Sequence, residues 1–284
     1  MHGEFPDLSA DGPADRRRLF AEEARSERPD LAMLCLLVGA EADPAVDEAA
    51  LDAAQIELDR LAGLLPFGPT GPHAWACALA DLLGGRCDFR GTPGDYQRLE
   101  SSLLHKVLRR RRGLPILLSV VWIEVARRAG APVYGVALPG HFVVGFGDPH
   151  EQVLVDPFAG GRLLTGPDAE LMVAGATGAP LDPSMLAPAD PLEVVVRILN
   201  NIRAWASTRP EQSDVALWAL DLSLLVPSHP ARLRYERAQL LVQRGEFATG
   251  AAELDAYADV VAAVDQGAAE AIKGKARAAR AMLN

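Results

Sequence analysis

The sequence predicts an α+β fold in which helices predominate, with a central buried helix packed on a short antiparallel sheet and an all-helical segment at the C-terminal end. Three observations indicate this. Ala, Leu, Val and Arg dominate a chain with only 6% aromatic residues, which favours helices around an aliphatic core. Residues 116–125 are almost entirely apolar, as in a helix buried on all sides. Between residues 133 and 156 short runs of β-branched residues favour strands.

The bulk composition excludes several functional classes. A formal net charge of −10 argues against nucleic-acid binding, which requires a basic surface. No apolar run approaches the roughly 18 residues that span a bilayer, and residues 1–28 are expected to form a polar tail without a signal segment. The three cysteines, Cys35, Cys77 and Cys87, show no C-x-x-C spacing. We therefore expect a reducing, cytoplasmic location.

Residues 29–180 are expected to form one domain that opens with helices. Helical periodicity or apolar runs predict helices at 31–38, 47–65 and 74–83. The breaker-rich stretch PFGPTGPH separates the second from the third, and the loop GGRCDFRGTPGD follows the third.

A fourth helix is expected to begin near Ser101 or Ser102 and to end in the basic run Arg109–Arg112, before Gly113. Four consecutive arginines could form an anion site. Alternatively, cations in a last helical turn stabilise the helix dipole and remain solvated. The sequence leaves both interpretations open.

The central helix is expected to begin at Gly113-Leu114-Pro115 and to stop at Gly130-Ala131-Pro132. Three strands are then predicted at residues 133–137, 141–146 and 152–156. Residues 160–191 contain many prolines and glycines. They are expected to form an irregular connector with one short helix near residues 168–173.

Residues 190–284 are expected to form a helical segment. Its predicted helices are residues 192–206, 213–226, 231–244, 247–263 and 267–282. The stretch YERAQLLVQRGEFATGAAELDAYADVV resembles one tetratricopeptide unit whose usual alanine after the turn is Gly250. Such a segment can offer a binding groove or can equally cap the core.

His141 and Asp156 are the strongest candidates for chemistry. If the second and third strands form a hairpin around residues 147–150, positions summing to 297 lie opposite each other. The two residues then face one another with Cβ atoms about 5 Å apart. A carboxylate in that place can hold an imidazole in one tautomer. The alternative is that both residues only mark strand ends next to turns, because His141 follows Pro-Gly and Asp156 precedes a proline.

Several motifs in order closely resemble the transglutaminase-like superfamily, and within it the N-terminal domain of the SirB family of bacteria. They are FRGTPGDY, VLRRRRGLPI, SVVWIEVARR, LPGHFVV and VDPFAGG. The resemblance covers roughly residues 30–175. It implies a papain/transglutaminase-like core, often followed by tetratricopeptide-like helices, and an association with bacterial regulation.

The resemblance also implies where a catalytic triad would lie. In active members a cysteine at the start of the central helix attacks an acyl group, and a histidine and an aspartate complete the triad. These last two fall on His141 and Asp156, whereas the cysteine position falls at or beside Pro115, where no nucleophile stands. Ser119 lies one helical turn further in and is expected to be packed. The family commonly has Asn-Ser where this chain has Ser101-Ser102.

The cysteines do not obviously replace the missing nucleophile. Cys35 and Cys77 lie in apolar helical runs and are expected in the core. Cys87, in the loop beside two arginines, is the one thiol expected to be exposed.

Three functional hypotheses follow. The preferred one is a non-catalytic, regulatory module that binds a protein or peptide through a groove lined by His141, Asp156, Tyr134, Pro139 and Gly140. The second is a hydrolase or acyltransferase in which a His141/Asp156 dyad activates water or a substituted nucleophile. The third is a purely structural pair. No H-x-x-x-H, cysteine cluster or nucleotide-binding glycine loop occurs, so no metal or cofactor is expected.

Overall fold

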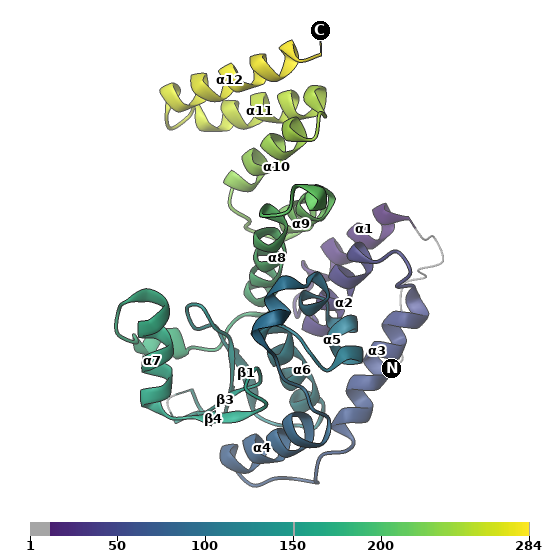
Figure 1. The fold of residues 1–284 in the computed structure, drawn as a ribbon, viewed down its shortest axis with the longest axis vertical. Coiled ribbons are helices and arrows are strands. Elements are labelled where there is room, and N and C mark those ends of the chain that lie inside the picture. Colours follow the sequence, from purple (N-terminus) through teal and green to yellow (C-terminus); the bar gives the residue numbers. More distant parts are fainter. Residues whose placement is uncertain (1–11, 150, 284) are drawn as a thin grey trace. The chain divides into compact units, whose positions relative to one another are not determined.

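The computed structural model of the chain describes residues 12–149 and 151–283 (Figure 1). The chain forms two compact units, Met1–Ile198 and Leu199–Asn284. The expected α+β class is confirmed. The first unit contains helices α1 (Pro13–Glu23), α2 (Leu31–Ala42), α3 (Glu48–Ala62), α4 (Pro72–Leu79), α5 (Leu104–Arg110), α6 (Pro115–Arg128) and α7 (Gly166–Thr177).

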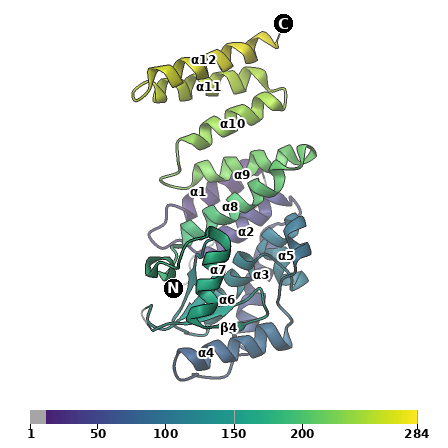
Figure 2. The ribbon, with the colours of Figure 1, turned by 60° about the vertical axis from the view of Figure 1, so that its left-hand side comes forward.

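Helix α6 is the centre of the first unit, as predicted. Pro115 occupies its first turn, where the missing N–H costs nothing, and Gly130 follows its end with φ of +85°. Residues 115–126 are all buried. The single charged residue among them, Glu124, forms ion pairs with Arg127 and Arg128. Helices α3 and α5 and the sheet surround α6 (Figure 2).

The sheet is antiparallel in the order β1-β2-β3-β4. Its strands are β1 (Val133–Val136), β2 (Val143–Phe146), β3 (Val153–Asp156) and β4 (Arg162–Leu164). The first three match the prediction. Helix α7, capped by Thr165, confirms the short helix expected near residues 168–173 but is longer than expected. Strand β4 lies where irregular chain was expected. Apolar residues of the sheet, including Val143 and Leu154, pack with Ala169 and Val173 of α7.

The predicted polar tail is wrong for residues 13–24. These form helix α1 and its cap, and Phe20 is fully buried. Arg17 of α1 forms an ion pair with Glu41 of α2, at 2.6 Å. Phe20 and its buried neighbours Leu19, Ala21 and Ala24 dock a short helix whose other face is charged, which is why a polar composition was misleading. Residues 1–11 lie outside the described residues.

The loop between α4 and α5 contains a π-helix, η1 (Ala80–Arg86), and two 3₁₀ helices, η2 (Pro93–Gln97) and η3 (Leu99–Ser102). Buried Asp95 organises it. Its carboxylate accepts hydrogen bonds from Thr92, from the Ser101 hydroxyl at 3.0 Å and from Arg110 at 3.3 Å. A Cβ added at Gly84 would overlap the carbonyl oxygen of Gly160, so this loop lies directly against the segment that follows β3.

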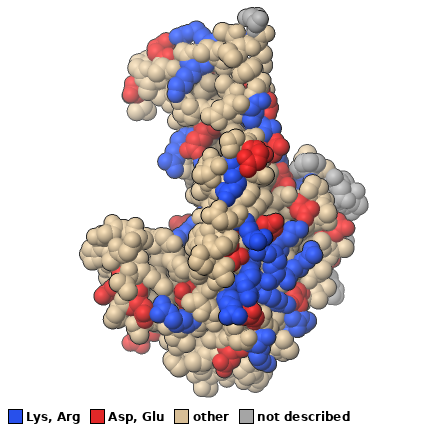
Figure 3. Space-filling view, viewed as in Figure 1, with Lys and Arg blue, Asp and Glu red and all other residues tan. Residues whose placement is uncertain are grey.

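The basic run is largely structural. Arg110 pairs with Asp95, Arg111 with Glu57 at 2.7 Å, and Arg112 with Asp88 at 2.8 Å. Lys and Arg side chains do gather over α5 in Figure 3. Because three of the four arginines bind carboxylates, the run fastens α5 to the loop and to α3 rather than forming an open anion site.

Helix α8 (Pro191–Ser207) contains the boundary between the units. The second unit continues with α9 (Ser213–Leu225), α10 (Arg232–Gln243), α11 (Phe247–Val261) and α12 (Gln266–Ala281), close to the predicted ranges. At Gly250 a Cβ would lie 2.6 Å from Val242 and 3.0 Å from the Ala238 carbonyl. The glycine that replaces the usual alanine therefore lets α10 and α11 approach closely.

No helix of the described residues is long and apolar enough to cross a bilayer.

We expect Asp95→Ala to lower the free energy of unfolding by about 3 kcal/mol or more, because it leaves Arg110 and two hydroxyl donors without their buried acceptor. Urea denaturation measures the change. Asp59→Ala, which removes an exposed carboxylate paired with Arg128, is the control and should cost less than about 1 kcal/mol. Equal effects of the two variants would contradict the assigned role of Asp95.

His105 predicts a pH dependence of stability. Its ring is buried against Gly39, and burial, followed by the charge of Lys106, lowers its pKa from 6.5 to about 4; Asp43 opposes this and Arg109 adds to it. Between these values the unfolded chain binds a proton that the folded chain does not. The free energy of unfolding should therefore fall by about 2–3 kcal/mol as pH drops from 6.5 to 4.

Urea melts across this pH range test the prediction. His105→Leu should flatten the slope relative to wild type, whereas His73→Gln, at an exposed position, should keep it. A slope that is unchanged in His105→Leu would show that another group is responsible.

Candidate functional site

His141 and Asp156 form a hydrogen-bonded pair at one end of the sheet. The Pro139-Gly140 turn precedes His141, which lies just before β2, and Asp156 is the last residue of β3. The distance from His141 Nε2 to Asp156 Oδ1 is 3.0 Å. The side chains are 17% and 5% exposed, respectively. The histidine edge thus reaches solvent while the carboxylate is enclosed.

The pair forms in a register different from the predicted one. Val144 lies opposite Val155 and Gly145 opposite Leu154, so paired positions sum to 299 rather than 297. A shift of two residues keeps every side chain on its expected face. His141 and Asp156 are consequently diagonal neighbours rather than direct ones, and the long imidazole side chain closes the extra distance.

Two aromatic rings border the pair, and the sequence did not single out either of them. Phe158 donates its backbone N–H to Asp156 Oδ1 at 3.0 Å and presents its ring edge-on to His141, with centroids 6.1 Å apart. Tyr96 meets Phe158 in turn, at 5.9 Å. Gly91 donates its N–H to the Phe158 carbonyl at 2.9 Å. The FRGTPGDY loop therefore borders the site, although its sequence did not indicate which side chain would do so.

Arg197 of α8 approaches the pair from another segment. Its Nη2 donates to the carbonyl oxygens of Leu138, at 2.7 Å, and of His141, at 2.6 Å. Its guanidinium lies 5.6 Å from the centre of the Phe142 ring. Burial lowers the pKa of Arg197, and the charge of Tyr96 partly opposes this. The residue fixes the turn that carries His141, and no sequence motif pointed to it.

No nucleophile of the described residues contacts the His141 ring. Its one hydrogen bond there is to Asp156, which leaves Nδ1 without a protein partner. Pro115 is buried at the start of α6. Ser119 is fully buried and donates its hydroxyl to the Phe142 carbonyl at 3.3 Å, so it lies near the site but is already engaged.

The cysteines are distributed differently from the prediction in one case. Cys35 is buried as expected. Cys77 is only partly buried, and its Sγ lies 3.6 Å from His73 Nδ1 on the exposed side of α4, because α4 is amphipathic rather than enclosed. Cys87 is also partly exposed. The loop of Cys87 does come to the site, but through Gly91 and Tyr96.

The predicted groove residues are not all brought together. Gly140 has a positive φ of +71° and lies against Ala176 of α7. Tyr134 instead donates its hydroxyl to Gln152 at 3.0 Å and lines a hollow of about 350 Å³ with Glu124 and Arg127. It lies opposite Gly145, four residues along β2 from His141. The position of Tyr134 in a ligand groove therefore stays a prediction.

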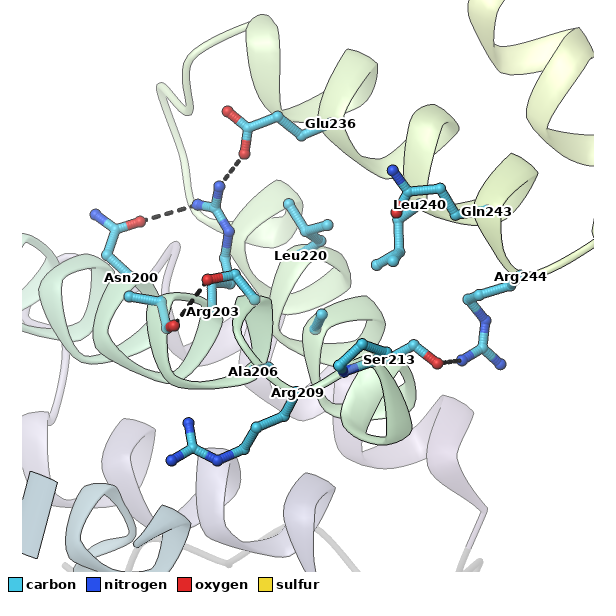
Figure 4. A pocket seen from close by; sticks show the side chains of 14 residues that line it. Asn200, Arg203, Ala206, Arg209, Ser213, Leu220, Glu236, Leu240, Gln243 and Arg244 are labelled. Atoms are coloured by element: carbon cyan, nitrogen blue, oxygen red, sulfur yellow. Dashed lines mark hydrogen bonds and ion pairs between the residues drawn. The ribbon is translucent and has the colours of Figure 1, made fainter. Parts of the chain in front are cut away.

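A larger hollow, of about 590 Å³, lies within the second unit (Figure 4). Polar side chains of α8 and α10 line it: Arg203 bonds to Asn200 and Glu236, and Arg244 bonds to Ser213 at 2.9 Å. Leu220 and Leu240 supply apolar lining. The lining of this hollow thus combines paired charges with aliphatic surface.

The chemistry available at the His141–Asp156 pair is that of a fixed imidazole. With Nε2–H donated to Asp156, neutral His141 presents Nδ1 as a hydrogen-bond acceptor or a base. No group of three His, Cys, Asp or Glu side chains within the described residues is arranged to hold a metal ion.

Comparison with known proteins gives two family matches. A model described as the transglutaminase-like superfamily matches residues 48–200, and a tetratricopeptide repeat model matches residues 202–284. A UPF0162 protein of Xylella fastidiosa (strain Temecula1) is 34% identical over 60% of this chain and 62% of its own length. A UPF0162 protein of Pseudomonas aeruginosa is 37% identical over 39% of this chain and 41% of its own.

A more distant similarity is to F-box only protein 21 of Mus musculus, which is 24% identical over 55% of this chain and 26% of its own length. The chain thus spans less than two thirds of each of these three relatives.

Thiol reactivity should separate the cysteines. Burial, with the charges of Glu124 and Asp30, raises the pKa of Cys35, so we expect Cys77 and Cys87 to react with Ellman's reagent in the native protein and Cys35 only after unfolding in guanidinium. Single Cys77→Ser and Cys87→Ser variants should each lose one fast-reacting thiol. Three fast thiols in the folded wild type would contradict this placement.

Proposed function

Because the chain belongs to the transglutaminase-like superfamily, we propose that its first unit is a non-catalytic, regulatory module that binds a protein or peptide at the His141–Asp156 pair. One observation carries this proposal: the His141 ring has a fixed orientation and an unused Nδ1, but no thiol or hydroxyl of the described residues lies within hydrogen-bonding distance of it.

The start of α6 supports the proposal. In an enzyme of this architecture, a cysteine there would gain thiolate character from the helix N-terminus and from the neighbouring imidazolium. Pro115 offers neither a nucleophile nor an N–H group, and it is buried. A binding role is compatible with losing the nucleophile while keeping the histidine–aspartate pair.

The surroundings of the pair are suited to recognition. The partly exposed imidazole lies beside Phe158 and next to Tyr96, which is 47% exposed. Aromatic surfaces with polar tips are frequent at protein interfaces. The tetratricopeptide-like second unit offers a further peptide-binding surface in the hollow between α8, α9 and α10. Both units would then contribute to partner binding.

A hydrolase or acyltransferase is the alternative, and the free Nδ1 favours it: a fixed imidazole could activate water or a nucleophile of the substrate. A third role, in which the pair only holds the turn before β2, is consistent with the enclosure of Asp156.

The three roles predict different outcomes for His141→Ala and Asp156→Asn. In the binding role, both variants fold and lose at least about tenfold in affinity for a partner captured by wild type, as measured by calorimetry with the purified partner. Arg18→Gln, which removes an exposed arginine of α1 paired with Glu22, is the control and should bind as wild type does. Retention of full affinity in both variants would refute the binding role.

The alternatives are separated in the same experiment series. An enzyme would turn over amide or ester substrates in a way that His141→Ala abolishes and alkylation of Cys77 and Cys87 leaves intact. A structural pair would lower the melting temperature in both variants while the folded fraction binds normally.

A further inference from the structure

Arg197 brings a positive charge close to the His141–Asp156 pair. Among the described residues, no carboxylate forms an ion pair with it. Both of its hydrogen bonds come from Nη2, which donates to the carbonyl oxygens of Leu138 and His141. Its Nε and Nη1 have no hydrogen-bond partner among the described residues, yet neither is sealed from solvent. Nε–H and the N–H groups of Nη1 thus remain available, but as separate donors, because each two-donor edge of a guanidinium includes Nη2.

This arrangement differs from that of three partly buried arginines of the same unit. Arg110 binds Asp95, Arg112 binds Asp88, and Arg128 binds Glu124. Transfer of a guanidinium away from water is costly unless an anion accompanies it, and here burial lowers the pKa of Arg197. Two carbonyl groups and the Phe142 face offset part of that cost without neutralising the charge.

We propose that Arg197 recognises a carboxylate of the ligand that binds beside His141. This inference rests on the proposed binding function and names the chemistry of the partner. With Nη2 engaged, Arg197 offers a carboxylate its positive charge and a single N–H group, from Nε or from Nη1. The ligand is therefore a peptide that presents either its C-terminal carboxylate or an acidic side chain.

Two neighbours are placed to assist. Nδ1 of His141 is unpartnered and can donate to a carboxylate once the ring is protonated. The pKa of Tyr96 is raised, by burial and then by the charge of Asp156, so its hydroxyl stays a neutral donor at physiological pH. A bound carboxylate would in turn stabilise the His141 imidazolium, because an opposite charge nearby favours the charged form.

Acetate is the first probe, with acetamide as its uncharged counterpart, added to the isotope-labelled full-length protein. The resonances of Arg197 Nε–H and of the His141 ring are followed by NMR. We expect saturable shifts with acetate and none with acetamide. The Arg197→Gln variant should weaken acetate binding about tenfold or more, read from the His141 ring. Arg18→Gln, which removes an exposed arginine paired with Glu22, should not.

Loss of the turn rather than of the charge is the main confounding effect of Arg197→Gln. Unchanged amide shifts of β2 and β3 exclude a loss of the turn. Arg197→Lys provides a second test, because it keeps the charge but lacks the Nε–H and Nη1 donors. Lysine should retain weak acetate binding, intermediate between wild type and Arg197→Gln. Equal acetate affinity in wild type and Arg197→Gln, or equal shifts with acetamide, would overturn the proposal.

Three short peptides then identify the source of the carboxylate: N-acetyl-Ala-Ala with a free C-terminus, the same peptide as an amide, and N-acetyl-Ala-Glu-Ala amide. Arg197-dependent binding of the first alone indicates C-terminal recognition, and binding of the third indicates an acidic side chain. If a captured partner depends on His141 but no carboxylate probe binds, the carboxylate inference fails while the binding function stands. If carboxylates bind but no partner depends on His141, the function fails instead.

Discussion

Burial of α6 on every side is the constraint on which the first unit depends. A helix with almost no polar face must be shielded from water along its length. The sheet therefore covers one side of α6, and helices α3 and α5 cover the others. Glu124 is tolerated only because Arg127 and Arg128 neutralise it one turn later. The position of β2 against α6 then fixes the turn at Pro139-Gly140, and through it His141. The geometry of the site is thus a consequence of how an apolar helix is covered.

Charge pairing completes this arrangement from outside the core. Asp95 collects donors from η2, η3 and α5, so the loop that carries Tyr96 is held by one buried carboxylate. The arginines after α5 secure the adjoining segments in the same way. Arg197 departs from the pattern, since its hydrogen bonds go to backbone carbonyls. Arg197 therefore differs from the arginines that join segments of the fold through carboxylates.

Elements with a strong periodic signal could be predicted from sequence, and those that depend on distant contacts could not. The limits of α6 and of the helices after residue 190 follow from apolar spacing, proline and glycine. The face of the sheet on which His141 and Asp156 lie was also predictable, because a register shift of two residues leaves each side chain on the same face. The register itself could not be predicted, since the sequence between β2 and β3 does not specify the length of the turn. Helix α1 and strand β4 are short and depend on packing against their neighbours α2 and β3. The roles of Tyr96 and Arg197 depend on partners far away in the chain.

The contact between Gly84 and Gly160 has a consequence for how this sequence can diverge. Two motifs more than seventy residues apart share one van der Waals surface, but the restriction is one-sided. A side chain at Gly84 needs room that the Gly160 carbonyl occupies, whereas a Cβ at Gly160 would meet no atom and is disfavoured only by its φ of +69°. Over evolutionary time, loss of Gly84 should therefore be accompanied by remodelling of the segment that holds Phe158, while Gly160 can change without any response from the Gly84 segment.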